Sequence, residues 1–551
     1  MTRVPTTLYR GGSVYTPADP FATAMVVDGG VVAWVGSDEA AQSHSDGVDE
    51  VVDLEGRLVT PAFVDAHVHV TETGLLLTGV DLSTTSSLGA ALDAVAAAAA
   101  ARPGEPVLGH GWDERLWPEQ RPPTRAELDR AAAGAVVYLS RVDVHSAVVS
   151  TRLAERGDLA ALPGWDDAGR VERDAHHAAR DLTRALDDAH RRSVQERALR
   201  AAAAAGIGCV HECAAPHVGS PADLSSLLAL AAEPGAGLPT VLAYWGGLAT
   251  DADDARRVVR SLGEDVAPHV LGLAGDLCVD GSVGSRTAAF REPYADAADA
   301  GLPADHRGCL YLDAAQVRDH VIACTRAGLQ AGFHVIGDAA VDVVLEGFAG
   351  AARVVGDAAL RAARHRLEHL ETVDDAAVTA LAAYGLTASV QPAFEALWGG
   401  RSGMYAERLG PGRGARLNRF GALAAAGVPL ALGSDTPVTP FDPWSAVRAC
   451  AFHSDPDERI SARAAFLAHT RGGWRAARRD DAGVLALGAP ATFAVWDAAE
   501  LVVQAPDDRV QAWSTDPRSG TPGLPDLTPG IPLPRCLRTV VDGRVVHDAL
   551  A

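Results

Sequence analysis

Two histidines close an apolar run that begins near Leu58, in the segment Val64-Asp-Ala-His-Val-His69. Because a β-strand alternates its side chains between two faces, His67 and His69 share one face, with Asp65 behind them. Neutral imidazole nitrogens bind zinc-like divalent ions readily. A chance pair of histidines on a solvated strand would look the same, so the rest of the chain must decide.

Three more residues of the same chemistry follow later β-rich segments: His334, His369 and Asp435. Imidazoles can anchor a divalent ion whose open position holds water and lowers its pKa towards about 7. A carboxylate beside that water can take its proton and pass it to a leaving group. The competing interpretation is that His334 and His369 are ordinary hydrogen-bonded histidines near helix starts. Their repeated position at strand ends favours a hydrolytic metal site.

The elements that must position these residues alternate β-rich segments with Ala-rich helices, which predicts a parallel sheet. The first expected strand carries His67, and seven more follow: 206–212, 240–245, 270–279, 329–336, 364–369, 386–391 and 429–434. Eight such units predict a TIM-like (β/α)₈ barrel, an α/β fold whose functional side chains lie at the C-terminal strand ends. A doubly wound sheet is the alternative.

Both ends of the chain are rich in short strands and turns. We therefore expect residues 1–58 and 484–551 to form one small β-sandwich domain, and residues 59–483 to form the barrel. The first two barrel strands are separated by a segment far longer than an ordinary crossover. It predicts an inserted subdomain at about residues 75–200.

Composition excludes several classes of protein. The 551 residues carry a formal net charge of −23, and all 48 cationic residues are arginine. An acidic chain argues against a nucleic-acid partner, which needs clustered positive charge. The seven scattered cysteines fit reduced thiols in the cytoplasm, and we expect neither a signal peptide nor a membrane span. We expect a small-molecule substrate and, as a working hypothesis, a homodimer.

Five ordered motifs give the chain a family resemblance. It resembles the amidohydrolase superfamily, and within it the YtcJ-like branch (amidohydrolase family 3) that includes N-substituted formamide deformylases. The matching segments are Val59–His69, Asp280–Ala289, Gly332–Asp338, Arg366-Leu-Glu-His369 and Gly433–Val438, with further matches at Gly111–Glu114 and Arg141–His145.

The resemblance implies a barrel hydrolase that depends on one or two divalent ions, with zinc as the expected metal. His67, His69, His334 and His369 would be metal ligands, and Asp435 would contact the metal and act as general acid/base. Many members with two metals bridge them through a carboxylated lysine, and this branch often has a lysine shortly before the Asp-Gly-Ser segment. Here that position is Asp276, and the chain has no lysine. We interpret Asp276 as a bridging or terminal carboxylate ligand, with a single metal held without it as the alternative.

Weaker signals point to substrate contacts. His211 and Glu212 end the second barrel strand, His145 lies in the insertion, Arg286 follows the fourth strand, and Trp112 could form an apolar wall. Each also has a structural explanation, as a rim residue, a surface histidine, a loop arginine or a core tryptophan.

The resulting hypothesis is a metal-dependent hydrolase that cleaves an amide or formamide-like C–N bond other than a peptide bond. Metal-activated water would attack the carbonyl carbon, a pocket histidine such as His334 or an arginine would stabilise the oxyanion, and Asp435 would move the proton. Two alternatives stay open. One is hydrolytic deamination of a cyclic amidine on the same scaffold, and the other is a non-catalytic barrel that binds a small molecule.

Overall fold

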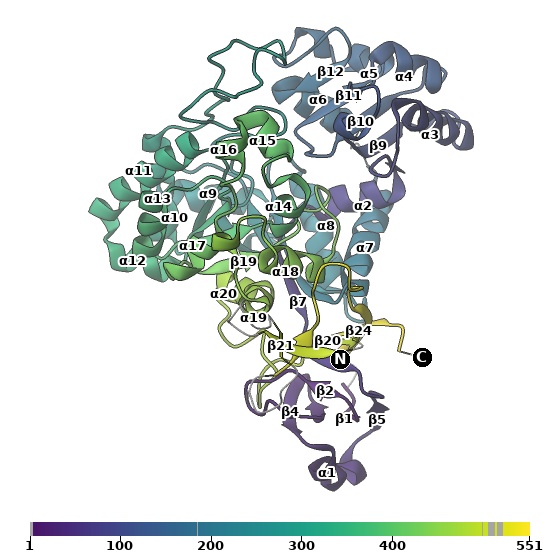
Figure 1. Cartoon of the computed structure of the whole chain (residues 1–551), viewed down its shortest axis with the longest axis vertical. Helices are drawn as coiled ribbons and strands as arrows, with labels where there is room; N and C mark the ends of the chain where they lie inside the picture. The colour runs from purple at the N-terminus through teal and green to yellow at the C-terminus, as the bar shows by residue number, and fades with distance from the viewer. Residues whose placement is uncertain (1–3, 184–185, 499, 505–512, 515–521, 551) are drawn as a thin grey trace.

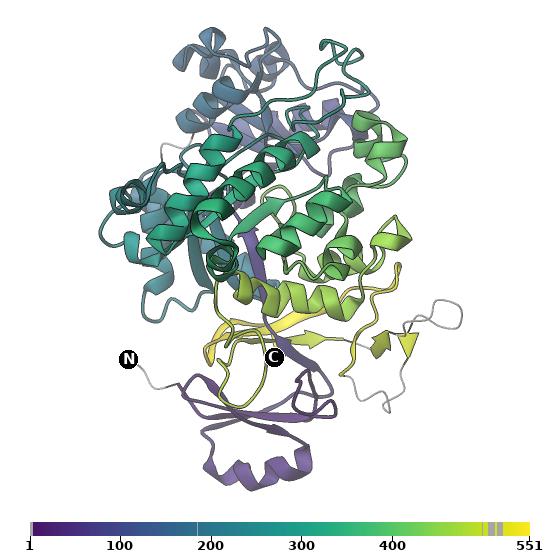
Figure 2. The ribbon, with the colours of Figure 1, turned by 90° about the vertical axis from the view of Figure 1, so that its left-hand side faces the viewer.

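The computed structural model describes residues 4–183, 186–498, 500–504, 513–514 and 522–550. Three parts follow one another along the long axis of the molecule in Figure 1. A barrel lies in the middle, strands from the chain termini lie at one end, and an insertion lies at the other. Figure 2 shows the same order after a quarter turn.

The central part is an eight-stranded parallel sheet that closes into a barrel. Its strands are β7 (Phe63–Val68), β13 (Ile207–Ala214), β14 (Thr240–Trp245), β15 (Val270–Leu273), β16 (Gln330–Val335), β17 (Arg366–His369), β18 (Thr387–Val390) and β19 (Leu430–Leu432). The ends meet where Asp435 N donates to His67 O at 2.9 Å and His69 N donates to Thr436 O at 3.0 Å. The predicted TIM-like barrel is confirmed.

Helices surround the strands of the barrel. They are α2 (Val70–Thr78), α7 (Asp188–Ala204), α8 (Pro221–Ala232), α9 (Ala252–Ser261), α10 (Ala314–Ala327), α11 (Asp338–Val355), α12 (Asp357–Ala363), α13 (Asp375–Tyr384), α14 (Pro392–Trp398), α15 (Met404–Leu409), α16 (Pro411–Gly414), α17 (Phe420–Ala425), α18 (Pro443–Ala451), α19 (Ala462–Leu467) and α20 (Gly473–Ala476). Their ends follow local rules. Asp313 caps α10 in a capping box with Gln316, and Gly328 ends it with a φ of 78°.

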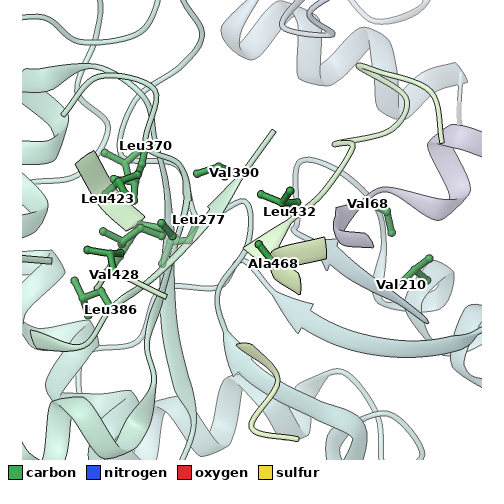
Figure 3. Close-up of a cluster of buried hydrophobic side chains, with 14 of the residues drawn as sticks. Val68, Val210, Leu277, Leu370, Leu386, Val390, Leu423, Val428, Leu432 and Ala468 are labelled. Atoms are coloured by element: carbon green, nitrogen blue, oxygen red, sulfur yellow. The ribbon is translucent and has the colours of Figure 1, made fainter. Parts of the chain in front are cut away.

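The barrel strands are buried on both faces, so β13 has no exposed residue although it contains His211 and Glu212. The main hydrophobic cluster joins these strands to the inner faces of the helices. Figure 3 shows part of it, in which Leu277, Leu370, Leu386 and Leu423 come from segments far apart in the sequence.

Two sheets built from both termini stack at the end of the barrel opposite the insertion. One has the order β4-β3-β1-β5 and the other the order β2-β6-β20-β24-β25. Their strands are β1 (Thr7–Arg10), β2 (Ser13–Val14), β3 (Ala24–Asp28), β4 (Val31–Gly36), β5 (Glu50–Asp53), β6 (Leu58–Pro61), β20 (Phe493–Asp497), β24 (Arg535–Val541) and β25 (Arg544–Asp548), with the short helix α1 (Asp38–Ala41). Met25 and Val27 of one sheet share a hydrophobic cluster with Val59 and Val495 of the other. Three short strands, β21 (Leu501–Gln504), β22 (Trp513–Ser514) and β23 (Leu524–Pro525), form a further small sheet.

The long segment between β7 and β13 folds around a five-stranded sheet of order β12-β11-β10-β9-β8. It contains β8 (Val80–Asp81), β9 (Val107–Trp112), β10 (Val137–Arg141), β11 (Ser146–Val149) and β12 (Arg170–Glu172), with α3 (Leu88–Ala101), α4 (Arg125–Ala131), α5 (Thr151–Arg156) and α6 (Arg173–Thr183). Within the described residues, no helix is both long enough and apolar enough to cross a bilayer.

One strand differs from the expectation. The sequence predicts a strand over 270–279, but β15 ends at Leu273. Gly275 adopts a φ of 78°, a left-handed conformation that ends the extended backbone. Asp276 therefore lies in the loop directly after the strand, where it can turn over the mouth of the barrel.

Candidate metal centre and substrate cavity

The candidate ligands come from the C-terminal ends of five barrel strands. His67 lies near the end of β7 and His69 directly after it, and the chain then turns into α2. His334 lies near the end of β16, and His369 is the last residue of β17. The two acids, Asp276 and Asp435, follow β15 and β19. All six are buried.

Two imidazoles and two carboxylates meet at one point. His67 Nε2 lies 3.2 Å from an oxygen of Asp276 and 3.5 Å from an oxygen of Asp435. His69 Nε2 lies 3.3 Å from Asp276 and 3.1 Å from Asp435. Two ligands at zinc-like bond lengths in tetrahedral geometry are about 3.3 Å apart. The spacing of these donor atoms therefore fits a shared divalent cation.

His369 extends this cluster. One atom from each of His67, Asp276 and His369 lies within 4.8 Å of the other two. His334 is adjacent to this cluster, because its ring centroid is 4.4 Å from that of His369. The four histidines predicted from sequence are thus brought to one end of the barrel, where His334 and His69 also line a cavity.

Unpartnered atoms test whether a cation fits. His67 Nε2, His369 Nε2 and Asp276 Oδ1 are buried without a hydrogen-bond partner among the described residues. The other ring nitrogen of each histidine is occupied: His67 Nδ1 lies 3.0 Å from Glu368 Oε2, and His369 Nδ1 lies 2.8 Å from Gln391 Oε1. Ligating histidines are commonly held in this way, with one nitrogen fixed and the other free for the metal. The residues fit a cation.

The charges around the site also favour a cation. Burial lowers the pKa of His67, but Cys213, Asp435 and Asp276 act the other way, so that it lies well above 6.5. Burial raises the pKa of Asp276, yet the facing His69 and His67 hold it well below its usual value. Positive charge, whether a proton or a metal ion, is therefore stabilised between these groups.

The backbone at two of these positions is unusual. His369 has a φ of 72° and Asp435 a φ of 56°. Residues other than glycine seldom adopt this left-handed region, although Asp and His do so more often than most. Such conformations cost free energy and persist only where the surrounding structure holds them in place. They are found most often at functional sites.

A second layer of charged residues lies beneath the ligands, inside the barrel. Arg366 Nε donates to Glu368 Oε1 at 2.6 Å, and Nη2 donates to Glu368 Oε2 at 2.9 Å. Arg366 also lies 3.0 Å from His211 Nδ1 and 4.4 Å above the ring of Tyr244. Both charged side chains are fully buried, so each needs the other.

A cavity of about 630 Å³ opens onto the cluster. His69, Asp276 and His334 line it, and so does His145 from the insertion. The ring of His145 is 5.6 Å from that of His334. The volume is that of an ordinary small-molecule site.

Comparison with known proteins decides the family. The amidohydrolase family model matches residues 50–547. The chain belongs to the amidohydrolase family. It is 27% identical to Protein LONG AFTER FAR-RED 3 of Arabidopsis thaliana, over 89% of this chain and 88% of that protein. It is 24% identical both to the putative amidohydrolase YtcJ of Bacillus subtilis (82% of this chain, 84% of the relative) and to the N-substituted formamide deformylase of Arthrobacter pascens (82% and 85%).

Two solved structures share the fold. They are uncharacterized metal-dependent hydrolases from Pyrococcus horikoshii and Pyrococcus furiosus, each 26% identical to this chain. Both matches cover 89% of this chain. The match covers 97% of the Pyrococcus horikoshii structure, with a TM-score of 0.69, and 98% of the Pyrococcus furiosus structure, with a TM-score of 0.67. The resemblance to the YtcJ-like branch is confirmed, and this amidohydrolase is a hydrolase by family.

The predicted substrate contacts of this amidohydrolase have different outcomes. His145 lines the cavity. Trp112 does not line it, because it is buried in the core of the insertion, where Nε1 donates to Leu139 O at 2.9 Å. Arg286 does not line it either, since its guanidinium pairs with Asp296 at 2.7 Å.

The two residues from the second barrel strand point in opposite directions. His211 faces the barrel interior and contacts Arg366. Glu212 accepts a hydrogen bond from Val70 N at 2.8 Å, and it lines a smaller pocket beside His69. Both are therefore supports beneath the rim of the amidohydrolase barrel.

Several residues of the site have no counterpart among the sequence predictions. Glu368 and Arg366 belong to a motif in which only His369 was assigned a role. Their spacing of two residues on a strand places them on one face, which was a usable signal. The outer wall of the cavity contains Arg180, His176, His177 and His217, and no spacing rule connects these to the barrel.

Proposed function

We propose that this amidohydrolase cleaves an amide or formamide-like C–N bond, other than a peptide bond, in a small molecule. The observation that supports this most strongly is the spacing of 3.1–3.5 Å between the Nε2 atoms of His67 and His69 and the carboxylates of Asp276 and Asp435. The deformylase named among its relatives acts, by its name, on N-substituted formamides.

In this proposal His67, His69, His369, Asp276 and Asp435 hold the metal, with His334 at the outer edge of the site. A divalent cation, for which zinc is our choice, supplies Lewis acidity that acidifies water and polarises the bond to be cleaved. These donors, including Asp276, would serve either one ion or two.

Asp435 moves the proton. A carboxylate oxygen of Asp435 accepts a proton from the attacking water and later gives it to the departing nitrogen. The surrounding histidines hold the pKa of Asp435 below its usual value against the opposing effect of burial, so it is ionised at neutral pH and ready to accept. His334 and His145 line the cavity where the carbonyl oxygen would gain negative charge, and either ring can donate a hydrogen bond to it.

The proposal is tested by product analysis on metal-loaded protein. Amides, formamides, esters and cyclic amidines are incubated with protein of known metal content. Release of a substituted amine with a carboxylic acid or formate supports it. Release of ammonia from cyclic amidines alone would replace it with a deaminase. Absence of hydrolysis across the panel would favour a non-catalytic barrel that binds a small molecule.

A further inference from the structure

One arginine in the lining of the cavity forms no ion pair with a carboxylate of the described residues. Arg180 lies on α6 of the insertion and lines the cavity. Its Nη2 donates to the backbone oxygen of His217. Its Nε is buried without an acceptor, and no carboxylate of the described residues lies within the 4.0 Å of an ion pair with this guanidinium.

Arg180 is half-buried, and three fully or nearly buried arginines near the site are paired. Arg141 has Asp143 at 3.1 Å, Arg366 has Glu368 at 2.6 Å, and Arg408 has Asp296 at 2.8 Å. Removing a charge from water is costly unless an opposite charge compensates it. Arg180 departs from this pattern, and it does so on the wall of the cavity.

The cavity lining around Arg180 is rich in imidazoles. Those of His176, His177 and His217 line the cavity with Arg180, as do the side chains of Glu72 and Asp174. Burial and the charge of Arg180 lower the pKa of His177 to about 4 and contribute to lowering that of His217 to about 3. These rings are therefore neutral at pH 7. A neutral imidazole can donate one hydrogen bond to an anion, but it carries no positive charge that would attract the anion away from Arg180.

The same cavity joins Arg180 to the metal centre. Its lining includes His69, Asp276 and His334 of the metal centre together with Arg180 and His217. A ligand in this cavity can therefore contact both the residues of the metal centre and the guanidinium. A guanidinium offers a fork of N–H donors that matches a carboxylate.

We propose that the substrate carries a carboxylate apart from the bond that is cleaved, and that Arg180 binds this carboxylate. The substrate class is an N-acylated or N-formylated molecule bearing a free acid group. This inference rests on the proposed function, which it narrows. Asp174 lines the cavity from the first turn of the same helix but forms no ion pair with Arg180, so it does not take the place of the substrate acid.

The test uses matched probes that differ only in charge. N-formylphenylalanine and N-acetylphenylalanine are compared with their neutral primary amides at the carboxyl end, using metal-loaded full-length protein. We expect kcat/KM to be at least about tenfold higher for the acids. In Arg180→Gln this preference should disappear through loss of activity on the acids, while activity on the neutral amides stays within about threefold. Arg180→Lys, which keeps the charge, should retain part of the preference.

Arg200→Gln is the matched control, since Arg200 pairs with Glu196 on the exposed side of α7. It should behave as the wild type. Equal activity on acids and amides in the wild type, or a preference that persists in Arg180→Gln, would overturn the inference while leaving the proposed hydrolase intact.

A binding measurement separates the two proposals. If metal-loaded wild type cleaves none of the four probes, calorimetric titration with the same acids and amides decides. Tighter binding of the acids that is lost in Arg180→Gln would support the carboxylate site even though these amides are not substrates. Equal binding, or no binding, would reject it.

Discussion

Glu368 Oε2 lies 3.0 Å from Nδ1 of His67, and both oxygens of Glu368 are held by the buried guanidinium of Arg366. The ring of His67 is thereby fixed so that Nε2 faces Asp276 and Asp435. The candidate metal ligand His67 is thus oriented by the charged pair Arg366 and Glu368, which lies in the barrel interior and does not line the cavity.

Replacing Glu368 should weaken metal binding. In Glu368→Gln the side chain keeps its size but loses the charge that favours an N–H on His67 Nδ1. Removing such a support commonly costs about 10–100-fold in metal affinity. We expect a loss of this size, measured by competition with a chelator, while circular dichroism remains that of the folded protein.

Glu346→Gln, on the exposed face of α11, is the control and should bind metal as the wild type does. Unchanged metal affinity in Glu368→Gln would mean that His67 is held by packing alone.

Asp435→Asn should remove turnover and keep most of the metal. The amide cannot accept the proton from water, and loss of a general base typically costs about 10²–10⁴-fold in rate. His67, His69, His369 and Asp276 remain in place. Metal content is measured by elemental analysis, and kcat is measured on the best substrate of the product screen.

Asp442→Asn is the matched control, because asparagine also caps helices and Asp442 accepts from Ser445 N at the start of α18. A fall in kcat no larger than that of the control would remove Asp435 from the proton transfer.

Asp276 stands at the position where the resemblance to this family leads us to expect a lysine. Its role is tested by measuring the metal content of the protein. Its oxygens lie 3.2 and 3.3 Å from the Nε2 atoms of His67 and His69. We expect protein purified without chelators to contain more metal per chain than Asp276→Ala purified in the same way. Equal stoichiometry in the two proteins would reject the ligand role.

The positions of the candidate metal ligands were predictable because the barrel puts the ends of parallel strands at one rim. His67, His334 and His369 needed only the correct assignment of their strands. Asp276 was predicted in a strand and lies in a loop, since the left-handed Gly275 ends β15 early.

The cavity wall was less predictable, because it depends on how the insertion docks on the barrel. Trp112 and Arg286 have side-chain types suited to ligands, yet Trp112 packs inside the insertion and Arg286 is neutralised by Asp296. Arg180 has no recognisable motif. It stands out because it lines the cavity and forms no ion pair with a carboxylate of the described residues, which only the tertiary structure reveals.

Acid should destabilise the barrel through histidines that are buried as neutral rings. His320 accepts a hydrogen bond from Ala249 N at 3.1 Å through Nδ1 and lies 3.0 Å from Leu273 O through Nε2. Burial lowers its pKa to about 4, and those of His365 and His469 are lowered to about 3 and about 4 for the same reason.

The sign follows from the unfolded chain, in which a histidine has a pKa of about 6.5. Between about pH 6.5 and pH 4 the unfolded state binds a proton that folded His320 refuses, so stability falls as pH falls. The limit is about 1.4 kcal/mol per pH unit for each such residue. In His320→Gln the side-chain amide can make both backbone hydrogen bonds and cannot titrate. Unfolding in urea at pH 7 and pH 5 should therefore show a shallower loss of stability for His320→Gln than for wild type. His190→Gln, on the exposed surface of α7, should match the wild type, and equal slopes for all three proteins would show that His320 takes up its proton without unfolding.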